Sequence, residues 1–281
     1  MTAPKPRDFL RKALIALAVA LGFWTLVLML FEDRFIYFPR PFPEGPYGDA
    51  QFIPHLEEFT LLTEDGVRLH AWYAPADTPI AVVLISHGNG GNLSYGIEHM
   101  RRLQLAGLSV FAYDYRGYGK SEGTPSEEGV VLDAVAAYDH LTGPLGVSAQ
   151  KVILWGTSLG GAVTVQLASR RPSAGLILES TFTSARDVAA RVYPFLPVRW
   201  FMRASFDAAG TLRTLPCPSL HIHGEQDEII DLDLGKALYD AAPGPKEWYV
   251  IPGCGHNDTY LLGGAEYVGR AVDFARACVQ R

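Results

Sequence analysis

A hydrophobic run that enters a glycine-flanked serine is the feature that most restricts the fold of this 281-residue chain. Residues 152–155 read Val-Ile-Leu-Trp and predict a buried strand, and residues 156–160 read Gly-Thr-Ser-Leu-Gly. Because glycine has no side chain, the backbone can turn sharply from the strand into a helix on either side of Ser158. The helix is expected to continue to the residue before Pro172. Its first turn would aim the backbone N–H of Leu159 at an anion formed beside the serine.

Two later strands offer the partners that a nucleophilic serine needs. A hydroxyl is a poor nucleophile at neutral pH, so it requires a base, and the base requires an orienting carboxylate. Residues 219–223 predict a strand, and Asp227 lies in the loop that follows it. Residues 247–251 predict another strand, and His256 lies in the next loop. We therefore assign Ser158 as nucleophile, His256 as base and Asp227 as the orienting acid.

A glycine-rich loop is the candidate site for the negative oxygen of a tetrahedral intermediate. Residues 80–86 predict an apolar strand, and residues 87–92 read His-Gly-Asn-Gly-Gly-Asn. Such a loop leaves backbone N–H groups open to a substrate oxygen, because few side chains obstruct them. We assign the backbone N–H groups of Asn89 and Leu159 as the two donors of an oxyanion hole.

These motifs and their order resemble those of the α/β-hydrolase superfamily, in which serine, acid and histidine follow one another along the chain. The resemblance covers about residues 57–281 and implies a mostly parallel sheet with helices on both faces. More narrowly, the chain looks like the membrane-anchored serine hydrolases with an HGN-type oxyanion loop, a group that includes eukaryotic lipid and protein-thioester hydrolases. The matching motifs are His87-Gly-Asn, the run 114–121, Gly156-Thr-Ser-Leu-Gly, Gly224-Glu-Gln-Asp and Gly255-His.

The coarse pattern of the chain agrees with an α/β fold. A hairpin at 57–63 and 67–74 is followed by alternating strands and amphipathic helices. Further strands are expected near 109–113 and 175–179, and helices near 93–106, 127–142, 158–171, 232–242 and 264–279. Residues 181–216 depart from this alternation, and the resemblance places a cap there. Its apolar stretch 192–202 is interpreted as an acyl-facing or membrane-facing wall, or as simple packing of a lid helix on the core.

The N-terminal segment predicts a membrane anchor. Residues 13–31 carry no charge, and as a helix they would span roughly 28 Å, close to the thickness of a bilayer core. A cleaved signal peptide is the alternative, although its apolar region is usually shorter. Basic residues in the segment 1–12 predict that the N-terminus is cytoplasmic and that the catalytic domain lies outside. Residues 32–56 are expected to be a tether that separates the anchor from the domain, 57–281.

Composition and side-chain spacing exclude several classes of function. A net charge of −6, without a basic cluster beyond the anchor, argues against a nucleic-acid partner. The three cysteines lack metal-binding spacing, and His221 and His223 have no third ligand nearby, so no metal or cofactor is expected. His87 is expected to brace the oxyanion loop. Asp114 is expected to cap a loop or to pair with Arg116.

We therefore expect a membrane-anchored serine hydrolase that cleaves a small-molecule or lipid-like carboxylic ester or thioester through an acyl-enzyme. An amidase or peptidase would use the same groups, and a tethered binding module without catalysis is a further alternative. Asp231, Asp233 and Asp258 are the alternative acids. We also expect residues 1–31 to hold the protein in the membrane without contributing to catalysis.

Overall fold

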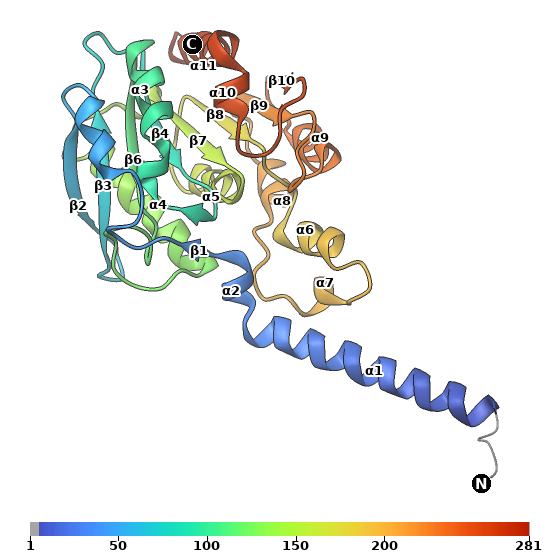
Figure 1. Cartoon of the computed structure of the whole chain (residues 1–281). Coiled ribbons are helices and arrows are strands. Elements are labelled where there is room, and N and C mark those ends of the chain that lie inside the picture. Colours follow the sequence, from blue (N-terminus) through green and yellow to red (C-terminus); the bar gives the residue numbers. More distant parts are fainter. Residues whose placement is uncertain (1–5, 281) are drawn as a thin grey trace.

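The protein is described by a computed structural model that covers residues 6–280. Its centre is an eight-stranded sheet with the order β10-β9-β8-β7-β4-β6-β3-β2 (Figure 1). Only the pairs β2·β3 and β3·β6 are antiparallel, and the other strands run parallel. The strands are β2 (Glu57–Leu62), β3 (Arg68–Ala74), β4 (Ala81–Ser86), β6 (Leu108–Tyr113), β7 (Val152–Thr157), β8 (Gly175–Glu179), β9 (Ser219–Gly224) and β10 (Lys246–Ile251).

Helices cover both faces of the sheet, and this confirms the predicted α/β-hydrolase fold. Every residue of β4 is buried, because β7 and β6 flank the strand within the sheet and helices pack on both faces of the sheet. Val82 and Leu84 contribute to the core under α4, α5 and α9, whereas Val83 and Ile85 contribute to the core under α3 and α11. The helices are α3 (Ile97–Leu105), α4 (Glu127–Thr142), α5 (Leu159–Ala168), α9 (Leu232–Ala241), α10 (Thr259–Leu262) and α11 (Gly264–Val279).

Two predicted helices differ in detail from the structure. The helix expected from residue 93 begins with a 3-10 turn, η2 (Leu93–Gly96), which Asn92 caps by accepting a hydrogen bond from Ser94 N. The helix after Ser158 ends at Ala168, which is before the expected end at residue 171. Both differences lie at helix termini, where local hydrogen bonds decide the last turn.

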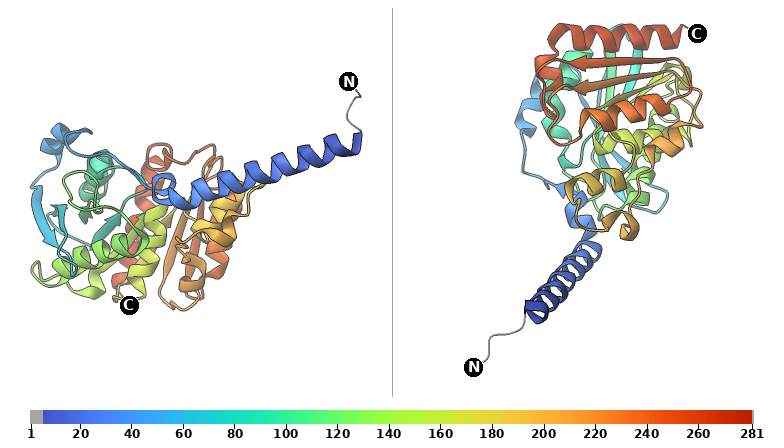
Figure 2. Two further views of the ribbon diagram at one scale, coloured as in Figure 1. Left: turned by 90° about the horizontal axis from the view of Figure 1, so that it is seen from below. Right: turned by 90° about the vertical axis from the view of Figure 1, so that its right-hand side faces the viewer.

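The cap lies between β8 and β9 and contains α6 (Ala185–Val192), α7 (Val198–Phe201) and α8 (Ala208–Leu212). Ser184 begins α6 by accepting a hydrogen bond from Asp187 N. Helix α8 packs on α5, whereas α6 and α7 pack together beyond the sheet, and α7 contacts the N-terminal helix (Figures 1 and 2).

The N-terminal helix α1 (Pro6–Leu30) projects away from the domain (Figure 2). Among residues 6–280, one helix is long and apolar enough to cross a membrane, the segment Phe9–Leu30 with a mean hydropathy of 2.5. Its side chains include Phe9, Leu17 and Val19, each more than half exposed. Most of α1 therefore has no protein partner in the described chain. Part of the predicted basic flank, including Lys5, lies outside the described residues.

Residues 32–56, expected to be a tether between the anchor and the domain, are packed against the domain in the structure. Helix α2 (Glu32–Ile36) follows α1 directly, and β1 (Phe38–Pro39) pairs with β5 (Gly90–Gly91) of the oxyanion loop in a small parallel sheet. The loop side chain Asn92 donates to the carbonyls of Arg40 and Glu44. A 3-10 helix, η1 (Tyr47–Phe52), then leads to β2. The segment is held by hydrogen bonds to residues about fifty positions later, which its proline-rich composition does not reveal.

Candidate active site

Ser158 stands at a strained corner between β7 and α5. Its backbone has φ 54° and ψ −120°. Residues other than glycine rarely adopt this conformation, which costs on the order of 1–3 kcal/mol. The two flanking glycines, Gly156 and Gly160, permit this turn because backbone carbonyls lie where their side chains would otherwise stand. A Cβ on Gly156 would collide with the carbonyl of Gly160, and a Cβ on Gly160 would collide with the carbonyl of Ser86. Ser158 N also donates to Glu179 O at 2.8 Å, which fixes the corner against β8.

The structure brings Ser158, His256 and Asp227 into one hydrogen-bonded row. His256 Nε2 lies 3.1 Å from Ser158 Oγ, and His256 Nδ1 lies 2.8 Å from Asp227 Oδ2. All three side chains are buried. In this geometry a proton on Nδ1 leaves Nε2 free to accept the proton of the serine hydroxyl.

Asp227 is held in place by its own loop. Its Oδ1 accepts hydrogen bonds from Ile229 N at 3.0 Å and from Ile230 N at 2.8 Å. Burial alone would raise the pKa of this carboxyl, but the hydrogen bond from His256 and those from the two backbone N–H groups outweigh burial and lower it. The carboxylate is therefore ionised at neutral pH and can orient the imidazole.

The alternative acids lie elsewhere. Asp231 pairs with Arg191 on the surface, and Asp258 accepts a hydrogen bond from Cys254 Sγ at 3.0 Å. Asp233 is exposed in the first turn of α9. Among the described hydrogen bonds and ion pairs, none of these three carboxylates is bonded to His256, whereas Asp227 is.

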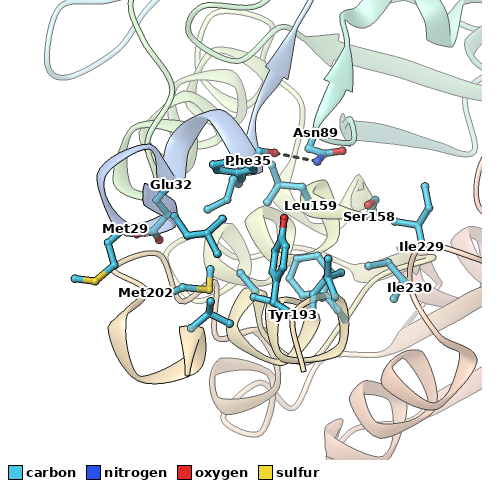
Figure 3. Close-up of a pocket in the computed structure, with 18 of the residues that line it drawn as sticks. Met29, Glu32, Phe35, Asn89, Ser158, Leu159, Tyr193, Met202, Ile229 and Ile230 are labelled. Atoms are coloured by element: carbon cyan, nitrogen blue, oxygen red, sulfur yellow. Dashed lines mark hydrogen bonds between the residues drawn. The ribbon is translucent and has the colours of Figure 1, made fainter. Parts of the chain in front are cut away.

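The oxyanion loop passes over the serine. A Cβ on Gly88 would lie only 3.7 Å from Ser158 Cβ, and Asn89 and Leu159 line a cavity together with Ser158 (Figure 3). Asn89 O accepts hydrogen bonds from Phe38 N at 2.9 Å and from Tyr118 Oη at 2.7 Å. Asn89 Nδ2 donates to the carbonyl of Ile36 at 2.9 Å. The segment that follows the anchor thus holds the loop, while the role of the Asn89 and Leu159 N–H groups stays a prediction.

His87 lies beneath this loop. Its Nδ1 is 2.7 Å from Gly88 O, and its ring packs on Tyr115 and Tyr118. Burial lowers the pKa of His87, so the imidazole is neutral. Asp114 supports the same loop by accepting a hydrogen bond from Leu93 N at 2.7 Å.

Of the two roles expected for Asp114, support of a loop and pairing with Arg116, the structure shows the first. The guanidinium of Arg116 instead bonds the carboxylates of Asp65 and Asp133. Asp133 lies on α4 and Asp65 in the β2–β3 turn, so the arginine points away from the oxyanion loop.

Sequence reasoning missed Glu179, the last residue of β8. Its carboxylate is buried and accepts hydrogen bonds from Trp155 Nε1 at 2.8 Å, Thr157 Oγ1 at 3.1 Å and Tyr267 Oη at 3.0 Å, and also from Thr259 Oγ1. These donors come from β7, α10 and α11, so Glu179 joins the serine strand to the elements that follow the histidine loop. The sequence signal was only an acidic residue at the carboxyl end of a buried strand.

His223, for which no metal partner is expected, lies behind Asp227. Its Nε2 is 2.9 Å from the carbonyl of Ile230 and 3.4 Å from Asp227 Oδ2. Burial lowers the pKa of His223, so it is a neutral ring that closes the acid loop. His221 faces Ser219 Oγ at 3.0 Å. Among residues 6–280, no group of three His, Cys, Asp or Glu side chains is arranged to hold a metal ion.

Comparison with known proteins agrees with this fold. A family model described as serine aminopeptidase, S33 (Hydrolase_4) matches residues 77–213. The α/β-hydrolase domain-containing protein WAV2 of Arabidopsis thaliana is 34% identical, over 86% of each chain. An esterase of Pyrococcus furiosus has a similar structure, with a TM-score of 0.71, 19% identity and coverage of 86% of this chain and 98% of that one.

One relative bears on the N-terminal helix. A protein of Saccharomyces cerevisiae described as an uncharacterized membrane protein, YNL320W, is 36% identical over 77% of this chain and 78% of its own length. Together with the exposed apolar helix α1, it supports association of this protein with membranes. On its sheet topology, its serine elbow and its relatives, the chain belongs to the α/β-hydrolase family.

Proposed function

We propose that the protein is a membrane-anchored serine hydrolase that cleaves a carboxylic ester or thioester through an acyl-enzyme. The observation that carries the proposal is the position of His256 between Ser158 Oγ and Asp227, at 3.1 Å and 2.8 Å. A nucleophilic serine needs a base within hydrogen-bond distance and a third group that orients the base, whereas a histidine with a purely structural role needs neither.

In the proposed reaction His256 Nε2 takes the proton of Ser158 as Oγ attacks the carbonyl carbon. The Nδ1 proton remains on the imidazole because the Asp227 carboxylate accepts its hydrogen bond. The N–H groups of Asn89 and Leu159 stabilise the negative oxygen of the tetrahedral intermediate. His256 then protonates the departing alcohol or thiol, and afterwards it deprotonates the water that releases the acyl group.

The description of the matching family makes an aminopeptidase the second candidate. Such an enzyme needs a carboxylate near the serine to bind the substrate's ammonium group. Glu32 and Glu179 are the carboxylates among the described residues that line the two cavities at Ser158. Glu32 accepts hydrogen bonds from Arg203 N and Ala204 N, and Glu179 accepts those of four side chains. Because both are engaged, the ester or thioester reaction is favoured.

We also propose that α1 crosses the membrane with the basic N-terminus in the cytoplasm and the hydrolase domain outside. Four basic residues precede the span, whereas Glu32, Asp33 and a single basic residue, Arg34, follow it directly, so the excess of Lys and Arg lies on the N-terminal side. Protease protection of sealed membrane vesicles tests this orientation. A domain that is digested only from the cytoplasmic side would reverse it.

The experiment for the reaction compares the wild-type protein and Ser158→Ala in detergent micelles. Labelling by a fluorophosphonate probe and turnover of p-nitrophenyl butyrate, an acyl-thioester and an aminoacyl amide are measured on both. We expect labelling and ester or thioester turnover in the wild type and loss of both in the variant. Turnover that survives in Ser158→Ala would refute the nucleophile, and turnover of the amide alone would favour the peptidase.

A further inference from the structure

Ser158 lies where two cavities of different character meet. The first cavity, of about 200 Å³, is lined mainly by hydrophobic side chains and extends from Ser158 and Leu159 toward the N-terminal helix (Figure 3). The second, of about 750 Å³, is lined by the oxyanion loop, by Ser158 and by His256. It includes polar groups of Arg40, His99 and Tyr260. Asn89 and Ser158 line both cavities, so a bond positioned for attack would have its two halves in different surroundings.

The anchor itself forms part of the apolar cavity. Leu28 and Met29 come from the last turns of α1, and Phe35 comes from α2. Across from them, Val188 and Met202 come from the cap. Figure 3 shows Phe35 and Met202 on two sides of this space, Met29 at its outer edge, and Tyr193 between them and Ser158. The last two turns of α1, expected only to hold the protein in the membrane, thus also line the cavity at Ser158.

A buried carboxylate fixes the anchor against the cap. Glu32 is only 4% exposed, and it accepts hydrogen bonds from Arg203 N at 3.1 Å and from Ala204 N at 2.7 Å. Thr25 is also buried where α1 meets the cap. The end of α1 and the cap are thus hydrogen-bonded to each other, and together they form the wall of the cavity that lies farthest from Ser158.

The cap carries apolar side chains beside this opening. Phe195 is 87% exposed and Trp200 is 84% exposed, and α7, to which Trp200 belongs, contacts α1. Water-exposed aromatic residues next to a membrane-crossing helix would lie at the bilayer surface, where their rings are stable. The cavity would then open at the level of the lipid acyl chains.

We infer that the substrate is a membrane amphiphile whose acyl chain enters this cavity from the bilayer, along a wall formed by the protein's own anchor. This inference rests on the proposed hydrolase function and specifies its substrate class. The acyl chain lies among Met29, Phe35, Val188 and Met202, its carbonyl carbon reaches Ser158, and the polar leaving group occupies the wider cavity near Arg40 and Tyr260. The alcohol or thiol leaves toward water, and the acyl group remains on the serine until it is hydrolysed.

The test narrows the apolar cavity from the side of the anchor. Met29→Trp adds bulk inside the cavity, and Leu30→Trp is the matched control, because Leu30 is 66% exposed and does not line the cavity. Met202→Trp narrows the cavity from the cap. For full-length protein in detergent micelles, kcat/KM is measured on p-nitrophenyl esters from butyrate to palmitate.

Each methylene buried in the cavity should raise kcat/KM about fourfold, so loss of room for two should lower the ratio of long-chain to short-chain activity about 16-fold. We expect this loss in Met29→Trp and Met202→Trp and an unchanged ratio in Leu30→Trp. An unchanged ratio in both cavity variants would overturn the inference, and so would equal losses in Leu30→Trp. The proposed hydrolase function would survive either result. It would fail separately if the wild type hydrolysed none of these esters.

A second measurement identifies the source of the acyl chain. The wild type is reconstituted in phosphatidylcholine vesicles that contain either a lysophospholipid or an S-palmitoyl peptide, and release of palmitate is measured. Hydrolysis of the lysophospholipid identifies a lipid ester, and hydrolysis of the peptide identifies a lipid-modified protein. Cleavage of water-soluble butyrate esters with no release from either vesicle would overturn entry from the membrane.

Discussion

Replacing Asp227 by asparagine tests the proposed catalytic role of this carboxylate, which hydrogen bonds hold on both of its oxygens. Asp227 Oδ1 accepts the N–H groups of Ile229 and Ile230, and Oδ2 accepts the Nδ1 proton of His256. An asparagine can keep its carbonyl toward the two backbone N–H groups, because nothing else satisfies them. Its NH₂ group then faces His256 Nδ1. Because the NH₂ group cannot accept the Nδ1 proton as Oδ2 does, the tautomer with its proton on Nε2 is favoured, and Nε2 can then no longer take the proton of Ser158.

The magnitude follows from this change of tautomer. Loss of the orienting carboxylate with the geometry preserved lowers kcat about 10⁴-fold in serine hydrolases, which corresponds to about 5.5 kcal/mol of barrier. KM should change little, because Asp227 lines neither of the cavities at Ser158. The fold should persist, since asparagine has nearly the volume of aspartate and keeps the two backbone hydrogen bonds.

The assay is the turnover of p-nitrophenyl butyrate by Asp227→Asn in detergent micelles, with circular dichroism to verify folding. Asp258→Asn is the matched control, because Asp258 lies in the histidine loop and contacts Cys254 rather than His256. We expect the control to remain within about tenfold of the wild type, since it removes no hydrogen bond to the imidazole. A folded Asp227→Asn that keeps more than a tenth of wild-type kcat would refute the assignment of the acid.

Three further predictions concern packing, anchoring and pH. Gly160→Ala should lower the melting temperature and abolish fluorophosphonate labelling, because its Cβ would collide with the backbone carbonyls of Ser86 and His87 and such overpacking costs about 1–3 kcal/mol. Normal labelling would contradict this. Glu32→Ala should destabilise the protein by about 2–4 kcal/mol in denaturant titrations, because the N–H groups of Arg203 and Ala204 lose their acceptor. An unchanged midpoint would show that these two hydrogen bonds contribute nothing to stability. Burial, and to a lesser extent the charge of Lys246, lowers the pKa of His221 to about 3 in the folded protein. As the pH falls below 6.5, this histidine takes up a proton in the unfolded chain but not in the folded one. The free energy of unfolding should therefore fall as the pH decreases from 6.5 toward 3. His221→Gln should have a shallower pH dependence, and identical slopes would exclude this cause.

The sequence by itself determined the α/β architecture and the location of the candidate catalytic groups. Alternating apolar strands and amphipathic helices are local patterns, and each strand end is marked by glycine or a polar loop. Since parallel strands present their carboxyl ends at one edge, Ser158, Asp227 and His256 could be assigned to a common edge before their distances were known. The glycines around the serine also carried local information, because a sharp turn needs them wherever it occurs.

Only the tertiary structure decided what surrounds this row. Glu179 became a junction because donors from three elements converge on it, and no spacing in the sequence indicates such a convergence. The segment after the anchor looked like a linker, yet it pairs with the oxyanion loop. Glu32 binds backbone N–H groups about 170 residues later. The anchor's place in the wall of the apolar cavity likewise depends on contacts between distant segments. Such contacts arise from packing in three dimensions, and they leave no periodic signal in the residues that make them.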